Sequence, residues 1–295
     1  MYSTVIRVSG TVLVLASISV GAGAARDQST VLVGAVRAYT VQPHDTLGAI
    51  GARHGVSVAT LKADNDLTKA RRLKPGQILH VDNRHLIPSG LSDGITINIP
   101  QRMLFLAREG RATHAFPVAV GQPDWQSPIG EFTIAAKEID PTWDVPRSIQ
   151  QEQRREGKRV LTKVPPGPAN PLGDRWLGVS GFAVGIHGTN APASVFGFTT
   201  HGCFRLHPDD ARIVFDLVDV GTPVHLVYRP VLAAVDEAGR LWVEVNPDAY
   251  GRAGNLERLA RGIIEEPASL IGGVLDDAGL RRCIREARGR PCLLK

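Results

Sequence analysis

The feature that most constrains the fold of this chain is the close spacing of short apolar runs after Asp93. Isoleucines at positions 95, 97 and 99 alternate with polar residues, and this period of two is typical of a strand with one buried face. Further β-type runs with turns between them cover residues 102–108, 112–120, 131–136 and 224–228. Short strands at this spacing favour a sandwich or barrel over βαβ units. We therefore expect a mostly β domain over residues 93–229, with one or more short helices.

One helix interrupts the β pattern after residue 207. Pro208 suits the first helical position, and Asp209 and Asp210 suit the positive end of the helix dipole. Apolar residues at positions 213, 214 and 217 share one face, and Gly221 is a suitable stop. The sequence predicts a helix from Pro208 toward Gly221.

Residues 38–82 predict a separate α+β unit. Strand signals at its two ends, 39–41 and 78–81, enclose two short helical patterns. We expect the first helix to be capped by Asp45 and the second by Ser57. Residues 83–92, centred on Pro-Ser-Gly, read as a linker to the β domain.

The C-terminal part has a different texture. Residues 230–249 predict a β-hairpin that turns at Ala238-Gly239. Residues 250–295 read as a helical, arginine-rich tail, with a helix that starts behind Asn255 and is broken by Pro267. We expect this tail to pack on the β domain, and its sequence carries no sign of a function.

The first 25 residues predict an export signal. Arg7 precedes an apolar run from Val8 to about Val20, and small residues at 21–25 offer a cleavage site. An uncleaved anchor or a buried helix is the alternative. Export would place the protein outside the cytoplasm, where thiols tend to oxidise.

Three cysteines are an odd number for an exported protein, which indicates a free thiol or an intermolecular bond. Cys283 and Cys292 lie close together, so a short-loop disulfide between them would leave Cys203 free. A bond from Cys203 to the tail is the alternative, and it would exclude a catalytic thiol.

The net charge of +5 fits an anionic partner, for which a bacterial cell wall is one candidate. No nucleic-acid recognition motif accompanies the charge, and we expect no nucleic-acid partner. Much of the basicity is arginine in the last forty residues, which a solvated face also explains.

Cys203 lies in a setting that suits nucleophilic chemistry. A thiolate is the nucleophile, and an ordinary thiol is mostly protonated at neutral pH, so a base must be in reach. His187 ends a strand pattern and His201 lies two residues before the thiol, while Gly202 allows close approach of the backbone. We expect a loop to bring His187 to Cys203.

Three non-catalytic roles compete for these residues. Zinc ligation by His187, His201, Cys203 and His207 lacks the paired CxxC-type spacing of structural sites. A buried inert cysteine is the second role, and a strained disulfide is the third. We expect no metal and no cofactor.

The whole string decides between them. His187, Gly188, Thr200, His201, Gly202, Cys203 and Arg205 resemble the signature of the YkuD-type L,D-transpeptidases. The segment "VGQPDWQSPIGEFTI" resembles the turn of that family, and residues 38–82 resemble a LysM module, which binds the glycan of peptidoglycan. The combination is similar to the periplasmic branch that anchors outer-membrane lipoproteins.

The resemblance implies a transferase that acts on peptidoglycan. Cys203 would attack diaminopimelate of a tetrapeptide stem and release D-alanine, and His187 would move the proton, oriented by a carbonyl near Gly188. Gly188, Thr200, His201, Gly202 and Arg205 would form the oxyanion and substrate-positioning set. The acceptor could be a lipoprotein lysine, another stem's diaminopimelate or water, the last giving an L,D-carboxypeptidase. A non-catalytic wall-binding protein is the alternative.

Overall fold

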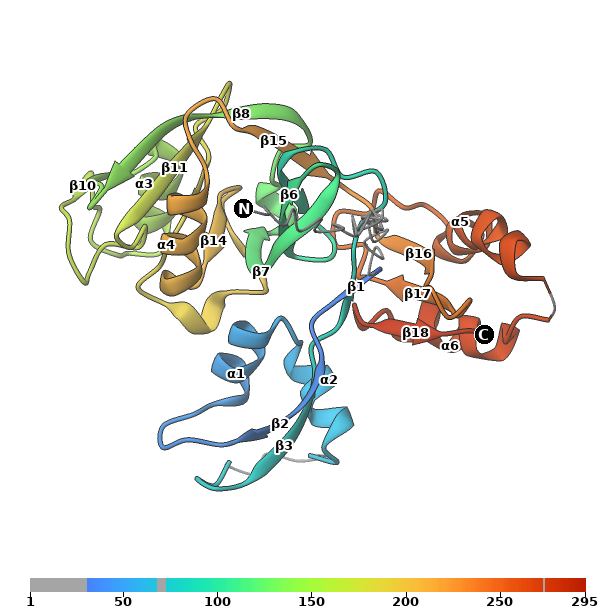
Figure 1. The fold of residues 1–295 in the computed structure, drawn as a ribbon. Coiled ribbons are helices and arrows are strands. Elements are labelled where there is room, and N and C mark those ends of the chain that lie inside the picture. The colour runs from blue at the N-terminus through green and yellow to red at the C-terminus, as the bar shows by residue number, and fades with distance from the viewer. Residues whose placement is uncertain (1–30, 68–72, 273) are drawn as a thin grey trace, which may run out of the picture.

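The computed structural model describes residues 31–67, 73–272 and 274–295. The predicted export signal at 1–25 lies outside these residues. Three parts are visible in Figure 1: an N-terminal module, a β barrel and a C-terminal unit. No helix in the described residues has the length and apolar character needed to cross a membrane.

The N-terminal module has the predicted strand–helix–helix–strand order. Its elements are β2 (Val36–Thr40), α1 (Leu47–His54), α2 (Val58–Asp64) and β3 (Ile78–Asp82). β2 and β3 pair antiparallel, and the two helices pack on them over a small core that includes Leu61, Leu79 and Val81.

The caps of the two helices differ in how well they were predicted. Ser57 caps α2, as expected, and accepts a hydrogen bond from the Thr60 amide. The prediction for α1 was wrong by one residue, because its cap is Thr46. The Asp45 carboxylate instead accepts hydrogen bonds from the Tyr39 hydroxyl and the Gln42 amide, both at 2.7 Å.

The β domain is a closed barrel. Its nine-stranded sheet has the order β13-β7-β14-β12-β11-β8-β15-β5-β6, and an added pairing of β7 with β6 closes the barrel, with β13 beside the end of β7. The strands are β5 (Gly94–Asn98), β6 (Met103–Arg108), β7 (Arg111–Gly121), β8 (Gly130–Ile139), β11 (Arg175–Val179), β12 (Gly185–His187), β13 (Phe198–Thr200), β14 (Phe204–Leu206) and β15 (Pro223–Val227). The predicted mostly β architecture is confirmed.

The predicted helix is α4 (Pro208–Leu217). It starts at Pro208 as expected, and Ala211 and Val214 enter the barrel core. The helix ends before Gly221, which lies in the turn into β15. Gly221 has a positive φ of 93°, and its amide donates a hydrogen bond to the Ile134 carbonyl. Two short 3-10 helices, η1 (Pro123–Trp125) and η2 (Pro192–Ser194), lie in loops of the barrel.

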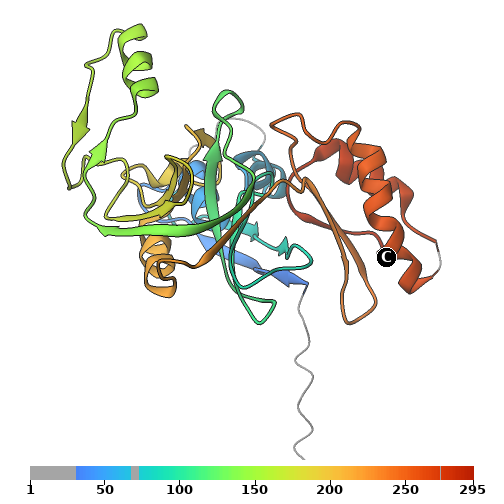
Figure 2. The same ribbon diagram turned by 90° about the horizontal axis from the view of Figure 1, so that it is seen from above.

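A segment between β8 and β11 leaves the barrel as an arm. It contains β9 (Trp143–Asp144), α3 (Arg147–Arg155) and β10 (Lys163–Val164), and β9 pairs with β10. Figure 2 shows this arm projecting from the sheet. The sequence analysis did not anticipate α3.

The segment expected to be a linker, residues 83–92, is partly folded. It contains β4 (His85–Leu86), which pairs antiparallel with β1 (Leu32–Val33). Leu86 is fully buried against Leu232 and Trp242 of the C-terminal unit. The segment is therefore a packed joint between the three parts.

The C-terminal unit has its own core. Its elements are β16 (Val231–Val235), β17 (Leu241–Val245), α5 (Leu256–Ile271), α6 (Asp277–Glu286) and β18 (Pro291–Leu293). The predicted hairpin is β16–β17, with Gly239 at positive φ in its turn. The tail is not purely helical, because β18 adds a third strand beside β17. Its helices pack on this sheet, where residues such as Ile264 and Leu280 form the core, and not on the barrel as expected.

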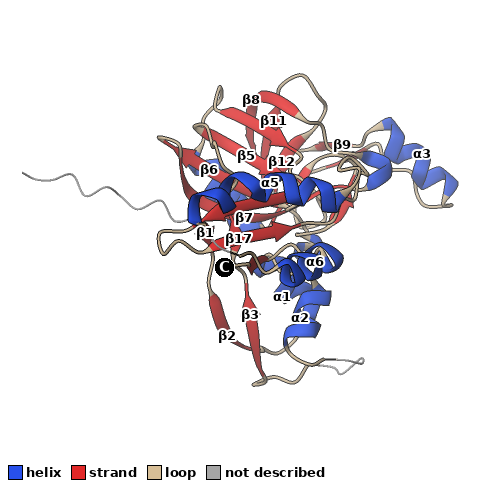
Figure 3. Cartoon of the chain, turned by 90° about the vertical axis from the view of Figure 1, so that its right-hand side faces the viewer, coloured by secondary structure: helices blue, strands red, loops and turns tan. Residues whose placement is uncertain are grey.

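Pro267 does not end α5, contrary to expectation. A proline inside a helix removes one backbone hydrogen bond. The helix nevertheless continues to Ile271, and both Ala268 and Ile271 pack against the core of the C-terminal unit. Burial beyond the proline therefore offsets the lost bond. Figure 3 shows α5 running across the sheets without a break.

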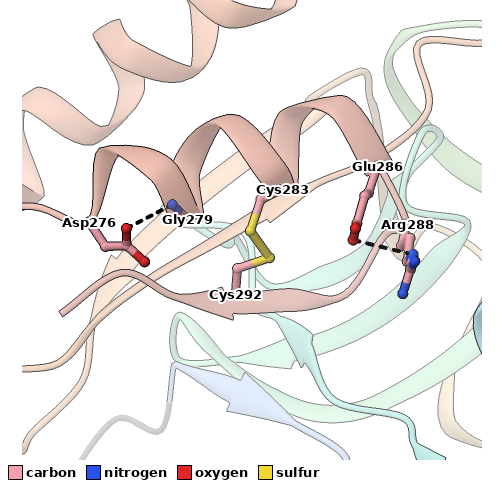
Figure 4. The surroundings of a disulfide bond; sticks show 6 residues. All are labelled: Asp276, Gly279, Cys283, Glu286, Arg288 and Cys292. Carbon is pink, nitrogen blue, oxygen red and sulfur yellow. Dashed lines mark hydrogen bonds and ion pairs between the residues drawn. A yellow bond between two sulfur atoms is a disulfide. The ribbon is translucent and has the colours of Figure 1, made fainter. Parts of the chain in front are cut away.

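The predicted disulfide between Cys283 and Cys292 is confirmed. It joins α6 to β18 within the C-terminal unit (Figure 4). Cys203 is a free thiol.

Candidate active site

Three neighbouring strands build the floor of the site. β11 and β12 are antiparallel with Trp176 opposite His187, and β12 and β14 are parallel with His187 beside Arg205. Side chains in register on adjacent strands share a face of the sheet. The adjacent residue on each of the three strands points to the opposite face and is buried in the barrel core; these are Leu177, Ile186 and Phe204.

Cys203 joins this face one step before β14. Continuing the parallel register places it beside Gly185, and a backbone hydrogen bond from Gly185 reaches its sulfur. His187 is two residues further along the adjacent strand. Strands lie about 4.8 Å apart and rise about 3.3 Å per residue, so the thiol and the imidazole are diagonal neighbours on one face.

Gly185 is required at this place. A Cβ here would lie 2.5 Å from the ring of Trp176, which leans over the glycine. The same ring stacks on His187, with 5.8 Å between centroids and 25° between planes. Trp176 therefore fixes the plane of the imidazole.

The tautomer of His187 follows from its neighbour. Nδ1 lies 2.6 Å from the Gly188 carbonyl oxygen, which can only accept, so we assign the ring proton to Nδ1. Nε2 then carries the free lone pair. A histidine held in this way is ready to accept a proton from a thiol.

Both members of the pair are neutral near pH 7. Burial, and next the charge of Arg205, lower the pKa of His187 to about 3, although the carbonyls of Gly188 and Leu172 oppose the shift. Burial raises the pKa of the Cys203 thiol, opposed by the Gly185 hydrogen bond and by Arg205. The site thus stores a neutral thiol and a neutral base, and charge develops only when the proton moves.

A tight turn presents Cys203. The hydroxyl of Thr200 donates to the Cys203 carbonyl at 2.6 Å and accepts the Gly202 amide at 3.2 Å. Gly202 has a φ of 105°, a conformation that glycine adopts without strain. The Gly202 amide is therefore already bonded within the turn, and the Cys203 amide follows it directly in the chain.

His201 contacts residues outside the turn of the nucleophile. Its Nε2 lies 2.7 Å from a carboxylate oxygen of Glu152 on α3, and its ring packs against Trp125 at 5.1 Å. Both partners of the ion pair are about one-third exposed. The contact links the loop of the nucleophile to the arm.

Arg205 brings a positive charge to the site face. Its guanidinium donates to the Ser194 hydroxyl at 2.8 Å, and its buried Nε has no hydrogen-bond partner among the described residues. Burial lowers the pKa of Arg205, which still leaves a cation at neutral pH. The group is placed to favour an anion nearby.

Sequence reasoning missed three residues at this site. They are Ser127, whose hydroxyl donates to the Gly202 carbonyl at 2.9 Å, together with Glu152 and Trp176. Ser127 lies in the Ser-Pro-Ile-Gly turn that the sequence analysis had singled out as a whole. No cluster of three or more metal-ligating side chains occurs in the described parts of the chain.

Comparisons with known proteins identify the two domains. A model of the L,D-transpeptidase catalytic domain (YkuD) matches residues 92–226, and a LysM domain model matches residues 39–82. The probable L,D-transpeptidase YbiS of Escherichia coli is 30% identical over 73% of this chain and 71% of its own length. The solved L,D-transpeptidase 1 of Mycobacterium tuberculosis is 26% identical, covering 45% of this chain and 60% of that one, but its TM-score of 0.34 carries no weight here.

A second curated relative is the probable L,D-transpeptidase ErfK/SrfK of Salmonella typhimurium. It is 31% identical over 73% of this chain and 71% of its own length. With the catalytic-domain match, this likeness shows that the chain is a transferase of the L,D-transpeptidase family.

Proposed function

We propose that this L,D-transpeptidase acts on peptidoglycan outside the cytoplasm, with Cys203 as nucleophile and His187 as base. The observation that carries the proposal is a free thiol and a buried, neutral imidazole on one face of neighbouring strands. A pair of this kind is the arrangement that nucleophilic catalysis by cysteine needs.

The first half-reaction forms a thioester. Nε2 of His187 takes the proton of the Cys203 thiol as the sulfur attacks the carbonyl carbon of diaminopimelate at the third position of a tetrapeptide stem. The carbon–nitrogen bond to D-alanine then breaks, and the imidazolium returns its proton to the leaving amine. The depressed pKa of His187 makes its protonated form a strong acid for this second step.

The second half-reaction uses the same groups in reverse. An acceptor amine gives a proton to His187 and attacks the thioester carbon, and the new amide forms as the carbon–sulfur bond breaks. Cys203 leaves as a thiolate and recovers its proton from the imidazolium. The enzyme ends in its starting state.

The other site residues position the reaction. Gly188 holds the tautomer of His187, and Thr200 and Gly202 shape the turn that aims the Cys203 amide at the oxyanion. Arg205 binds a carboxylate of the stem, for which a planar guanidinium is well suited. His201 connects this turn to the arm through Glu152.

The N-terminal module binds the glycan of the wall. It carries a groove of about 760 Å³ between the loop before α1 and the loop before β3, lined by residues such as His44, Thr46, Leu73 and Pro75. This binding brings the barrel to its stems, and it is the reason to place the protein in the periplasm at the cell wall.

The acceptor supplies an amine. The layout of module and barrel favours the C-terminal lysine of an outer-membrane lipoprotein, and a second stem is the alternative. Purified protein is incubated with a disaccharide-tetrapeptide and equal amounts of a lysine-ended peptide and a second stem, and the products are identified by mass spectrometry. A lysine adduct is expected.

The controls separate the other activities. Cross-linked dimers would assign a stem as acceptor, and tripeptide alone would make the protein a carboxypeptidase. If the donor stays intact while the protein binds the glycan, the protein has a wall-binding role and no transferase activity. Cys203→Ala should lose every product and retain wall binding.

A further inference from the structure

The turn that carries the nucleophile is held by a chain of hydrogen bonds that extends beyond the matched catalytic domain, which ends at residue 226. The first link is Ser127, which is 2% exposed. Its hydroxyl donates to the Gly202 carbonyl at 2.9 Å and accepts the Gly121 amide at 2.9 Å. Ser127 therefore ties the nucleophile's turn to the end of β7.

The second link is Tyr250, which follows the C-terminal hairpin. Its hydroxyl donates to the Gly121 carbonyl at 2.7 Å and accepts the Ser127 amide at 3.1 Å. Both bonds are buried. One phenol thus holds the backbone on both sides of the loop from residue 121 to residue 127, and so fixes where the Ser127 hydroxyl lies.

Tyr250 is itself held from its own side. Its amide donates to the hydroxyl of Tyr228 at 2.9 Å, and that hydroxyl donates to Asp248 at 2.6 Å. The two rings stack at 5.3 Å, and Phe198 meets Tyr250 edge-on. The side chain of Tyr250 is 8% exposed and belongs to the barrel core.

Peptide geometry carries the effect to the reacting atoms. The carbonyl of Gly202 and the amide of Cys203 belong to one planar trans peptide, so they point in opposite directions. A hydrogen bond that fixes the Gly202 oxygen also fixes the direction of the Cys203 N–H. Oxyanion donors are effective only when they are held in place before the reaction.

We propose that Tyr250 is a positioning residue for the transferase reaction. Its hydroxyl fixes Ser127, Ser127 fixes the Gly202 carbonyl, and this sets the aim of the Cys203 amide. The C-terminal part of the chain thereby completes the active site. The inference rests on the proposed role of Cys203 as nucleophile.

The test compares Tyr250→Phe with Ser127→Ala in the full chain. Each variant keeps the surrounding packing and removes one hydroxyl. We expect the kcat for transfer from a soluble tetrapeptide donor to fall about 10- to 100-fold in each, with KM within about 2-fold of wild type, because the lost aim affects the transition state and not substrate binding.

The double variant tests the relay itself. If Tyr250 acts through Ser127, Tyr250→Phe/Ser127→Ala should be no slower than Ser127→Ala alone, whereas two independent structural defects would multiply. Tyr39→Phe is the matched control, since it removes a tyrosine hydroxyl bonded to Asp45 in the N-terminal module. It should leave kcat unchanged on this glycan-free donor. Thermal unfolding shows whether each variant is folded. If Tyr250→Phe does not fold, the kcat of Ser127→Ala tests the link from residue 127 to the Gly202 carbonyl.

The outcomes separate this inference from the function on which it rests. Wild-type kcat in folded Tyr250→Phe, or losses that multiply in the double variant, overturns the role of Tyr250 and leaves Cys203 untouched. A wild-type protein that neither transfers nor is acylated at Cys203 overturns both.

Discussion

The N-terminal module and the C-terminal unit both flank the barrel, but they are attached in different ways. The module meets the barrel through an apolar cluster in which Ala52 packs with residues such as Met103 and Phe196, and through Arg53, which bonds to Asp210 at 3.0 Å. It also meets the C-terminal unit, where Arg290 bonds to Asp64 at 2.7 Å. The C-terminal unit includes Tyr250, whose hydroxyl bonds to Ser127 and Gly121 behind the turn of the nucleophile. One attachment is a dock on the surface, and the other is part of the catalytic machinery.

The joint between the parts shows the same contrast. Glu244 of β17 is fully buried and accepts hydrogen bonds from the Leu86 amide at 2.6 Å and from Gln101 at 3.0 Å, with His85 at 3.3 Å. A buried carboxylate with this many donors holds the C-terminal unit firmly to the barrel. The difference implies that a displacement of the module leaves the transferase activity unchanged, whereas a displacement of the C-terminal unit lowers it.

The largest effect is expected at that joint. Glu244→Ala leaves several buried donors without a partner, which should lower the free energy of unfolding by about 3 kcal/mol. Urea denaturation measures it. Glu237→Ala, at an exposed position of the neighbouring hairpin turn, is the control and should change little. An equal and small change in both variants would show that Glu244 does not hold the joint.

The disulfide should have the next largest effect. Cys283→Ser/Cys292→Ser opens a loop with a sequence separation of 9, which should cost the C-terminal unit about 2.5 kcal/mol. The rate of acylation of Cys203 by a carbapenem should not change, because Tyr250 precedes α6 and β18, the two elements that the disulfide joins. Urea denaturation and intact-mass kinetics measure the two. A slower acylation in a folded variant would mean that the helices and β18 of the unit, and not only Tyr250, support the site.

A smaller effect is expected where the N-terminal module docks. Arg53→Ala removes a partly exposed ion pair, and its side chain is 44% exposed, so the loss should be about 0.5 kcal/mol. Turnover of a soluble donor should stay at the wild-type rate. Differential scanning calorimetry measures the loss of stability, and product assays measure the turnover. Lys62→Ala, at an exposed position of the same module, is the control. A drop in turnover would place the module within the catalytic machinery and remove the contrast.

The smallest expected change is with pH. A base with an ordinary pKa near 6.5 would be mostly protonated at pH 5, and acylation by a carbapenem would slow about 30-fold between pH 8 and pH 5. Because burial and Arg205 lower the pKa of His187 to about 3, we expect less than a 2-fold change over this range. Stopped-flow or mass kinetics measures it. A fall centred near pH 6.5 would mean that His187 is not held neutral by its surroundings.

The sequence predicts features that are encoded locally. The alternation of Ile95 and Ile97, the cap at Ser57 and the helix start at Pro208 each depend on a few neighbouring residues, and each corresponds to an observed element. The pairing of Cys283 with Cys292 follows from closeness in the chain and from the odd number of cysteines. The period of two predicts the strand, but not that its polar residues Thr96 and Asn98 are buried as well.

The rest depends on contacts between distant residues. Nothing in the pattern around Tyr250 points to Ser127, 123 positions earlier, because a phenol can bond to any backbone group that the fold brings near. The course of α5 through Pro267 was missed because burial beyond the proline outweighs a local preference. Glu244 was missed because a lone carboxylate in a strand has no partner visible in the sequence.

The central claim is that Cys203 forms a thioester with the donor, and trapping that species tests it directly. The full chain is mixed with a tetrapeptide donor in the absence of an acceptor amine, and the reaction is quenched in acid. The protein is then digested, and the mass of the peptide that contains Cys203 is measured by mass spectrometry. The account predicts an added mass equal to the donor minus D-alanine, absent from Cys203→Ala. Donor that is consumed at the same rate by Cys203→Ala, with no adduct on the wild-type peptide, would contradict it.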